Sequence, residues 1–405
     1  MRVLMLNPSC GGPGYMHNLC NALVEAGCEV ELVTGPHFRR VSRCWRNITY
    51  VPRIAFYRRT QLRVYQAGSL TRPAWQLLRF GGHLISLARL TAALDRYDVL
   101  HLHFPPVLPV DARWVQLIRH QVPIVHTVHN LWPHRSKRDA RDGRRLRRLY
   151  QACHHLIAHT RDTVRGLIEE FGVPPERISR IPRGNFQQFW SQERAPVPAL
   201  DGAAPHMPMI LMFGELRPSK GADMLLRAAA RLRDRGLPFR VVFAGAPFGS
   251  VQPYRDLARE LHIEDRVVFH AHYIEEEAVP SYFEAASVIA LPYRAIDQSA
   301  VAIAAVTMGR AMVATRIAGP AELVEQGDCG LLVPVDDVES MAAALERLLT
   351  DTGLRYRFEA NARRYAETAL AWEPVAARTL AAYRTAGAAA AAVSKAPRHV
   401  GTRAG

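Results

Sequence analysis

Residues 209–236 of this chain read MILMFGELRPSKGADMLLRAAARLRDRG. The opening residues Met209–Phe213 are all apolar, and a short apolar run that ends at a glycine predicts a buried strand. From Lys220 to Gly236 the apolar residues recur at helical spacing and charged residues take the opposite face, which predicts an amphipathic helix ended by Gly236. The stretch is therefore a strand, a loop and a helix, the repeating unit of a parallel α/β sheet.

The same unit recurs along the chain in two series, which predicts an α/β fold with two doubly wound, Rossmann-like domains. The strands expected in the first series are Val3–Leu6, Val30–Val33, Val99–His101, Ile124–Val128 and His155–Ala158. Those expected in the second series are Met209–Phe213, Arg240–Ala244, Val267–His270, Val288–Leu291, Met312–Thr315 and Leu331–Val333.

The patterns also predict the boundaries of the domains. We expect an N-terminal domain over residues 1–192, a proline-rich linker over 193–208 and a C-terminal domain over 209–372. A helix over 373–386 is expected to return to the N-terminal domain, and the tail 387–405, which begins with an alanine tract, is expected to be disordered.

The formal net charge of +15 favours an anionic partner such as a membrane surface, a nucleic acid or a phosphorylated substrate. Two arginine-rich blocks lie in the first half of the chain. The block from Arg39 to Arg63 is interleaved with aromatic residues, and the second block runs from Arg135 to Arg148. Both predict a basic face on the N-terminal domain, although a solvated surface in an arginine-rich protein gives the same pattern.

The cysteines and the start of the chain indicate a cellular compartment. Six cysteines without C-x-x-C spacing argue against a zinc site or a disulfide framework, so we expect small buried residues in a reducing environment. The chain has no run of the roughly 18 apolar residues that a spanning helix needs, and its first residues resemble a strand more than a signal peptide. We therefore expect a cytoplasmic protein.

Two loops at strand ends can bind an anion. The loop from Asn7 to Gly14 precedes a helix expected near Tyr15, so backbone N–H groups point at the carboxyl edge of the sheet. It fits neither G-x-G-x-x-G nor the P-loop, and a tight turn without a ligand is the alternative. In the second loop, Arg217 and Lys220 stand beside a positive helix end, a favourable position for a diphosphate, with surface decoration as the alternative.

Several stretches together resemble the GT-B glycosyltransferases, in particular family 4 and the bacterial exopolysaccharide mannosyltransferases similar to it. The stretches that carry this resemblance are Gly11-Gly12, Asp98–His103, Val125–His134, Arg217–Lys220, Ala318–Pro334 and Ala371–Tyr383. They extend over most of the chain, and the stretch from Gly319 is highly specific. The resemblance implies a GT-B fold whose two domains face each other across a cleft, with an N-terminal acceptor domain and a C-terminal nucleotide-sugar domain.

The resemblance also implies roles for individual residues. His129 matches the family histidine that contacts the donor sugar near its reacting carbon, and it is the expected catalytic residue. Arg217 and Lys220 match the residues that neutralise the donor diphosphate, because fixed cations in a dry cleft stabilise a departing nucleoside diphosphate better than water does. We therefore expect no metal and no cofactor, and the sequence has no Asp-x-Asp motif between strands.

Further site residues are expected in other loops. The expected donor-binding residues besides Arg217 and Lys220 are Gly12, Asp297, Gln298, Ser299, Ala300 and Val301. His103 and Glu322 are further candidates for the cleft. Ala304 stands where much of family 4 has a glutamate that holds the ribose, and Glu215 stands where many members have the arginine. These departures leave the donor base and the stereochemistry open.

Other polar residues have competing interpretations. His101 and His103 end a strand and can equally be satisfied core histidines. His126 and His129 flank a strand end, so only one of them is expected to face the cleft. His154, His155 and His159 could suggest a metal, but they have no carboxylate nearby in the sequence and we expect none. Asp139 and Asp142 are available if the reaction needs a general base.

The preferred function is transfer of a sugar, with mannose as the candidate, from a GDP- or UDP-sugar to a lipid-linked or oligosaccharide acceptor in polysaccharide or glycolipid synthesis. A sugar-nucleotide epimerase is the second possibility, but the stretches from Gly319 and around Trp372 resemble transferases. A nucleic-acid-binding protein is the third, and no recognition motif supports it, so we expect no nucleic acid partner. The block from Arg39 to Arg63 predicts salt-sensitive peripheral binding to an anionic membrane surface at the inner face of the plasma membrane.

Overall fold

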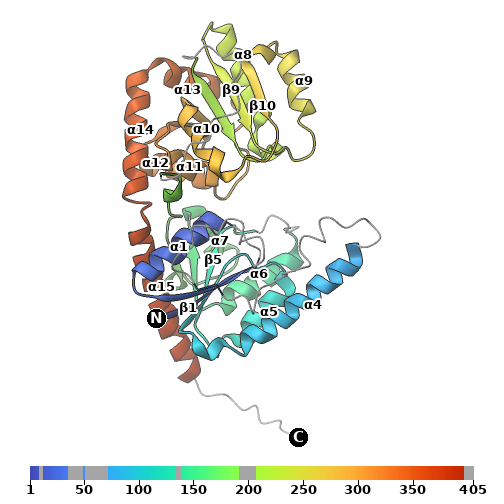
Figure 1. Cartoon of the computed structure of the whole chain (residues 1–405), viewed down its shortest axis with the longest axis vertical. Helices are drawn as coiled ribbons and strands as arrows, with labels where there is room; N and C mark the ends of the chain where they lie inside the picture. Colours follow the sequence, from blue (N-terminus) through green and yellow to red (C-terminus); the bar gives the residue numbers. More distant parts are fainter. Residues whose placement is uncertain (9–11, 35–48, 51–71, 133–137, 191–206, 396–405) are drawn as a thin grey trace. The chain divides into compact units, whose positions relative to one another are not determined.

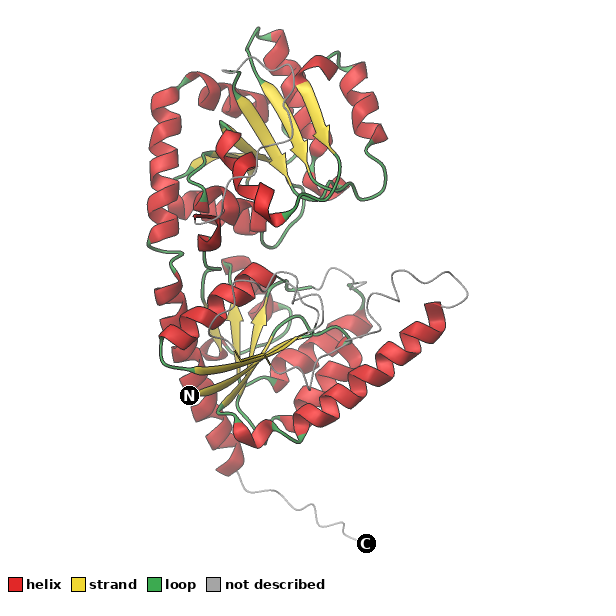
Figure 2. Cartoon of the chain, viewed as in Figure 1, coloured by secondary structure: helices red, strands yellow, loops and turns green. Residues whose placement is uncertain are grey.

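The computed structural model describes residues 1–8, 12–34, 49–50, 72–132, 138–190 and 207–395. The chain divides into two compact units (Figures 1 and 2). The N-terminal unit comprises Met1–His159, Thr163–Ile181 and Trp372–Gly405, and the C-terminal unit comprises Thr160–Asp162 and Pro182–Ala371. Each unit is an α/β sheet covered by helices, so the predicted fold class, GT-B with two Rossmann-like doubly wound sheets, is confirmed.

The N-terminal unit contains a parallel sheet with the strand order β3-β2-β1-β4-β5-β6-β7. Its strands are β1 (Arg2–Asn7), β2 (Glu29–Thr34), β3 (Thr49–Tyr50), β4 (Val99–Leu102), β5 (Ile124–Val128), β6 (His155–Ala158) and β7 (Ile178–Arg180). Its α-helices are α1 (Pro13–Glu25), α4 (Arg72–Thr91), α5 (Leu108–Ile118), α6 (Ala140–Ala152), α7 (Arg161–Glu169) and α15 (Trp372–Lys395). The strand order reverses next to β1, which places the loop after β1 at a topological switch point.

Side chains of β1 alternate between two apolar clusters. Leu4 and Leu6 belong to the cluster formed with α4, α5, α6 and α7, whereas Val3 and Met5 belong to the cluster formed with α1 and α15. Because helices cover both faces of the sheet, its strands are continuous apolar runs in the sequence, which is why they could be predicted.

The C-terminal unit contains a parallel sheet with the strand order β10-β9-β8-β11-β12-β13. Its strands are β8 (Met209–Phe213), β9 (Arg240–Ala244), β10 (Val267–His270), β11 (Val288–Leu291), β12 (Met312–Thr315) and β13 (Gly330–Val333). Its α-helices are α8 (Ala222–Asp234), α9 (Gln252–Glu260), α10 (Val279–Ala285), α11 (Ala300–Thr307), α12 (Ala318–Gly327), α13 (Val338–Thr350) and α14 (Thr352–Glu367).

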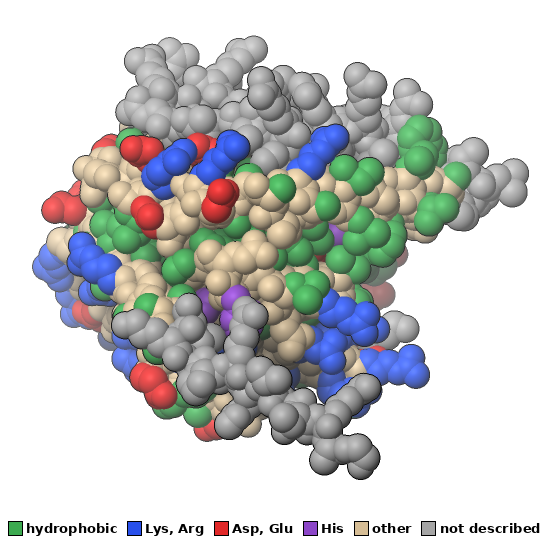
Figure 3. Space-filling view, turned by 90° about the horizontal axis from the view of Figure 1, so that it is seen from below, with side chains coloured by type: hydrophobic (Ala, Val, Ile, Leu, Met, Phe, Trp, Pro, Cys, Tyr) green, Lys and Arg blue, Asp and Glu red, His purple; other side chains and the backbone are tan. Residues whose placement is uncertain are grey.

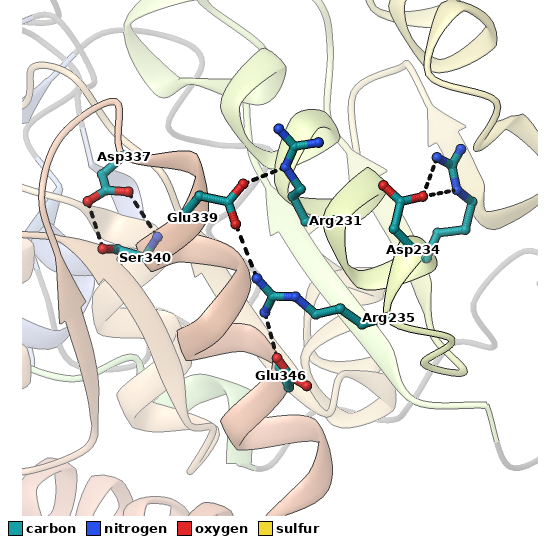
Figure 4. A network of polar contacts seen from close by, with 8 residues as sticks. Arg231, Asp234, Arg235, Asp337, Glu339, Ser340 and Glu346 are labelled. Atoms are coloured by element: carbon teal, nitrogen blue, oxygen red, sulfur yellow. Dashed lines mark hydrogen bonds and ion pairs between the residues drawn. The ribbon is translucent and has the colours of Figure 1, made fainter.

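Helices α8 and α13 pack side by side and are also joined by ion pairs (Figure 4). Arg231 Nε donates to Glu339 at 2.5 Å, and Arg235 contacts Glu339 at 3.2 Å and Glu346 at 2.5 Å. These side chains are substantially exposed, and exposed pairs contribute about 1 kcal/mol or less each. The buried apolar side chains of both helices, such as Leu225 on α8, are therefore the main source of their cohesion.

The expected end of the C-terminal helix can be compared with the structure, whereas most of the expected linker cannot. Helix α15 continues to Lys395, which corrects its expected end at residue 386 and the expected disorder from residue 387. The alanine tract explains the difference, because alanine has the highest helix propensity. Residues 396–405, and residues 193–206 of the expected linker, lie outside the described residues, as does the basic block from Arg39 to Arg63 except for Thr49 and Tyr50.

The described cysteines agree with the expectation of small buried residues. Cys20, Cys28, Cys153 and Cys329 are buried and free, while Cys10 and Cys44 lie outside the described residues. Among the helices that the structure describes, none combines the length and the hydropathy needed to cross a bilayer.

Candidate active site

The N-terminal unit places the expected catalytic histidine next to the loop after β1. Gly12 caps the start of α1 with a left-handed φ of 55°, and its carbonyl accepts the N–H of Met16 at 3.0 Å. Residues 9–11 of this loop lie outside the described residues. One turn into α1, the Tyr15 ring meets His129 edge-on, with the ring centroids 5.2 Å apart. The start of α1 therefore brings the predicted Gly12 loop and His129 to the same edge of this sheet.

His129 directly follows β5 and is only 7% exposed. The Phe104 ring stacks on it at 4.0 Å between centroids, with the two ring planes within 5° of parallel. Phe104 has a positive φ of 45°, an uncommon conformation for a bulky residue that is often stored at functional sites. Tyr15 and Phe104 were not singled out from the sequence, because neither belongs to a motif with a fixed spacing.

His103 contacts His129 and determines which ring nitrogen of His129 carries a proton. His103 Nε2 is 3.1 Å from Met5 Sδ, and its Nδ1 is 3.1 Å from His129 Nε2. A thioether sulfur can only accept, so Nε2 of His103 donates to Met5. Burial lowers the pKa of His103 well below its ordinary value, so the ring is neutral and its Nδ1 accepts a hydrogen bond from Nε2–H of His129.

His101 on β4 and His126 on β5 are engaged in the core of this unit. His101 contacts the Tyr383 hydroxyl and Thr127 Oγ1, each at 2.7 Å, and burial lowers its pKa to about 3. His126 contacts the Leu102 carbonyl at 2.9 Å and stacks on Tyr150. Its ring thus lies among residues of the α6 side of the sheet, whereas His129 lies beside Tyr15 of α1.

The other candidates in this unit have structural partners. The contacts of the three histidines considered for a metal are Ile124 N–H for His154, Ser179 for His155 and the Ile181 carbonyl for His159. In the described part of the chain, no group of three or more His, Cys, Asp or Glu residues could hold a metal ion. Asp139 caps α6 by accepting the N–H of Asp142 at 2.8 Å, and Asp142 pairs with Arg145 at 3.0 Å.

The C-terminal unit brings Arg217 and Lys220 together in the loop between β8 and α8. Arg217 contacts Glu215 through Nε at 2.6 Å and through Nη2 at 2.5 Å, and its guanidinium lies 5.5 Å from the centre of the Phe248 ring. Both members of the pair are 40% exposed, so Arg217 remains accessible from solvent. Glu215, which replaces the arginine seen in many family members, thus orients the arginine two positions further on.

Lys220 is held close to the backbone of the strand end. Its Nζ lies 5.4 Å from the centre of the Tyr293 ring, and a side chain at Gly214 would come within 3.0 Å of it. Gly214 has φ of +90° and Gly221 has φ of +69°, and a Cβ at Gly221 would come within 2.0 Å of the Pro292 carbonyl. Both glycines are therefore required by the shape of this loop. Burial, opposed by the nearby Glu215 carboxylate, lowers the pKa of Lys220 to about 8.

Arg294 fixes the same loop from the other side. Its backbone N–H donates to the Ser219 carbonyl at 2.7 Å, and its Nη1 donates to the Pro218 carbonyl at 3.1 Å. The guanidinium also forms a two-pronged contact with Asp223 at 2.8 and 2.7 Å and donates to Asp336 at 2.6 Å. The hydrogen bonds from Arg294 lower the pKa of Asp223. No motif marks Arg294 in the sequence, so the prediction of the site did not include it.

The predicted loop of Asp297, Gln298, Ser299, Ala300 and Val301 forms the start of α11. Ser299 caps this helix by accepting the N–H of Ala302 at 3.1 Å. The first N–H groups of a helix have no partner within it, so those at Ala300 and Val301 are suited to an anion. Both polar atoms of the Gln298 amide are buried and have no hydrogen-bond partner among the described residues. The Asp297 carbonyl accepts the N–H of Gly319 at 3.2 Å.

Ala304 and Glu322 occupy different positions relative to that loop. Ala304 lies in the middle of α11 and is 4% exposed, so no carboxylate stands where much of family 4 has the glutamate that holds the ribose. Glu322, on α12, accepts the backbone N–H of Arg161 at 2.8 Å and the side-chain N–H of Gln326 at 2.8 Å. Because Thr160–Asp162 belong to the C-terminal unit, both carboxylate oxygens of Glu322 are engaged by residues of its own unit.

These features define the class to which the chain belongs. Two parallel doubly wound sheets, with a buried histidine after one strand and a cationic loop before a helix, are those of a GT-B glycosyltransferase. Residues 207–351 match the family "Glycosyl transferases group 1" and residues 11–184 match "Glycosyltransferase Family 4". The chain belongs to the glycosyltransferases of family 4 and is a nucleotide-sugar-dependent hexosyltransferase.

Individual proteins similar to this chain include two sequence relatives and one solved structure. A D-inositol 3-phosphate glycosyltransferase of Corynebacterium glutamicum is 28% identical over 95% of this chain and 97% of that protein. One of Nocardia farcinica is 33% identical over 63% of this chain and 59% of its own length. The structure of HepE from Anabaena in complex with UDP-glucose has a TM-score of 0.69 and 19% identity, and the match covers 94% of this chain and 99% of that one.

The comparisons confirm the fold and the enzyme class expected from the sequence, but they do not support the expected subgroup. They identify a family 4 transferase, which excludes the epimerase and the nucleic-acid-binding protein as descriptions of the chain. The two curated relatives are D-inositol 3-phosphate glycosyltransferases, so the expected likeness to exopolysaccharide mannosyltransferases in particular is not what these relatives support.

Proposed function

We propose that the C-terminal unit binds the diphosphate of a nucleotide-sugar through Arg217, Lys220 and the loop of Asp297, Gln298, Ser299, Ala300 and Val301. The observation that carries this proposal is the setting of Lys220. Its charge is desolvated, as its lowered pKa indicates, and only the Glu215 carboxylate opposes that effect. An incoming diphosphate supplies the compensating charge that water no longer gives.

Two further features support a phosphate group at this position. The amide of Gln298 is buried and has no hydrogen-bond partner in the described part of the chain, and a bound ligand with polar groups would satisfy it. The N-terminus of α11 adds unused N–H groups and a positive helix end. Gly12 at the start of α1 offers a similar backbone in the N-terminal unit, where we assign it to the donor as well.

We assign the catalytic role to His129, as the family resemblance implies, with contact to the donor sugar near its reacting carbon. His103, whose Nδ1 accepts a hydrogen bond from Nε2–H of His129, keeps this histidine in one tautomer. We keep Glu322 as a candidate for the cleft, as the sequence suggested. Arg217 and Lys220 supply the charge that a divalent ion would otherwise provide, so we expect transfer to continue at full rate after treatment with EDTA.

The donor that we favour is a UDP-hexose, because the Anabaena HepE structure was solved in complex with UDP-glucose. GDP-mannose, suggested by the sequence, is the alternative. For the acceptor we retain a lipid-linked or oligosaccharide molecule in polysaccharide or glycolipid synthesis, at the cytoplasmic face of an anionic membrane. An inositol phosphate is the second candidate, because the relatives from Corynebacterium glutamicum and Nocardia farcinica are D-inositol 3-phosphate glycosyltransferases.

A thermal-shift panel of UDP-, GDP- and ADP-sugars tests the donor site, because a ligand that binds the native state raises the unfolding temperature. The favoured nucleotide should raise it, and Arg217→Ala and Lys220→Ala should each abolish most of that rise. Arg227→Ala, which removes an exposed arginine from α8, is the matched control and should behave as the parent does. Unchanged UDP binding in both site variants would overturn the diphosphate assignment.

A further inference from the structure

Helix α4 of the N-terminal unit is apolar on the face that points away from the sheet. Leu77, Leu84 and Ile85 are 72%, 43% and 55% exposed, and their spacing of seven and eight positions puts them on one side of the helix. Leu78 and Phe80 flank this stripe at 57% and 39% exposure. We call these five residues the α4 stripe.

The stripe is not the core-facing side of α4. The buried residues of the helix, His83, Ser86, Leu87 and Leu90, lie on the opposite side. There Leu87 and Leu90 join the apolar cluster under the sheet, and His83 contacts Asp111 of α5 at 2.7 Å. A helix on the surface of a domain normally carries polar residues on its outer side, so a second apolar face marks an interaction surface.

Helix α6, which packs into the same apolar cluster as α4, is strongly basic. Helices α4, α5 and α6 contribute to the same apolar cluster, and together they carry nine arginines and only two acidic residues, Asp111 and Asp142. Asp111 is buried against His83, and Asp142 pairs with Arg145, so neither leaves a free negative charge on the outer surface. Figure 3, which looks at the chain from below, shows hydrophobic side chains next to a group of Lys and Arg side chains.

The arginines of α6 point outward as a group. Arg141, Arg144 and Arg148 are exposed and follow one another at helical spacing, while Leu146 and Leu149 of the same helix are buried. Among the described residues, none of these three arginines forms an ion pair with a carboxylate. The outer side of this helical layer therefore combines an apolar stripe with uncompensated positive charge.

We propose that the α4 stripe and the arginines of α6 form a docking surface for an anionic lipid bilayer. An amphipathic helix lying in a membrane surface buries apolar side chains among the acyl chains while basic residues contact the headgroups, and this surface supplies both. A second copy of the chain suits it less well, because a symmetric pair would bring the same arginines face to face. The inference extends the proposed function, since it names the surface through which a lipid-linked acceptor would be approached.

The test is cosedimentation of the full chain with vesicles, without donor or acceptor, so that it succeeds or fails independently of the transferase assignment. Vesicles containing phosphatidylglycerol should bind the protein at low salt, and vesicles of phosphatidylcholine alone should bind it far less. Replacing the stripe as Leu77→Gln/Leu84→Gln/Ile85→Gln should weaken binding about tenfold or more, because the apolar contribution is lost. Replacing the charges as Arg141→Gln/Arg144→Gln/Arg148→Gln should weaken it about a hundredfold at low salt and flatten its salt dependence.

The control is Tyr356→Gln, which removes an exposed large side chain from α14 of the other unit and should bind as the parent does. Thermal unfolding and UDP binding of all variants should match the parent, since every replaced side chain is exposed. Equal binding to both kinds of vesicle, no binding to either, or full binding by the stripe variant would overturn the proposal. So would a parent protein that is a dimer in solution and becomes a monomer on replacement of the stripe, because a second copy would then be the occupant.

Discussion

At the scale of single residues, the lowered pKa of Lys220 predicts how the binding of a nucleoside diphosphate depends on pH. Burial brings its pKa down to about 8, so in the ligand-free protein the ammonium loses its proton just above neutral pH. Affinity for a nucleoside diphosphate should therefore fall as the pH rises from 7 to 9, by about tenfold if only the charged form binds. The terminal phosphate, with a second pKa of about 6, is already mostly doubly ionised at pH 7, so its own titration changes the affinity little over this range and in the opposite direction.

Isothermal titration with UDP at several pH values measures this dependence. Lys220→Arg keeps a charge that does not titrate in this range, so its affinity should be nearly independent of pH. An equally steep decline in that variant would assign the titration to another group.

His129 carries the second prediction at this scale. His129→Ala should leave the affinity for UDP close to that of the parent and lower kcat by about a hundredfold or more, because its proposed contact is at the reacting sugar carbon. His120→Ala removes an exposed histidine of the same unit and is the matched control. A variant with unchanged turnover would remove His129 from the site, and one with lost UDP affinity would move it to the nucleotide.

The residues that sequence reasoning missed are those that act through contacts made only in the folded chain. Arg217 and Lys220 could be named because they follow a strand and precede a helix at a recognisable spacing. Arg294, which reaches the loop from Pro218 to Lys220 across more than seventy positions, belongs to no local pattern. Nor could the sequence alone show that Glu215 and Arg217 form a pair.

At the scale of elements, the strands were predicted to within one residue at each end wherever both faces of the sheet are covered. The strands that were missed lack that signal, because β3 has two residues and β7, Ile178–Arg180, is partly exposed with a serine and an arginine. Helix α15 was predicted too short, since its alanine tract looks like low-complexity sequence although alanine favours helix. Composition is thus a weaker guide than periodicity at the ends of elements.

The loop between β8 and α8 gives a prediction at this scale, because Arg294 holds it by several hydrogen bonds. Arg294→Met should raise the Kd for UDP about tenfold while Lys220 and Arg217 remain in place, since a loosened loop no longer presents them together. Uridine, which lacks the diphosphate, should bind the variant and the parent alike. Arg316→Met removes an exposed arginine with a single carboxylate partner, Glu325, and should change neither affinity.

At the scale of the whole molecule, the N-terminal unit is assembled from distant parts of the chain. Helix α15 packs on α1, β5 and β6, and it buries Trp372, Val375 and Tyr383 to 4% exposure or less. The Tyr383 hydroxyl also contacts His101 at 2.7 Å, in the histidine cluster behind His129. The unit that carries the proposed catalytic residue therefore cannot be completed until α15 has been made.

A chain ending at Ala371 should consequently lose the fold of its N-terminal unit. Burial of one large apolar side chain contributes about 1.5–3 kcal/mol, so removing three of them subtracts an amount comparable with the net stability of a domain, about 5–15 kcal/mol. Circular dichroism and thermal unfolding should show a unit that is unfolded or melts far below the parent, and adding a peptide of residues 372–395 should restore it. A chain ending at Lys395 is the control and should unfold like the parent; if the chain ending at Ala371 did the same, α15 would not be part of this unit's core.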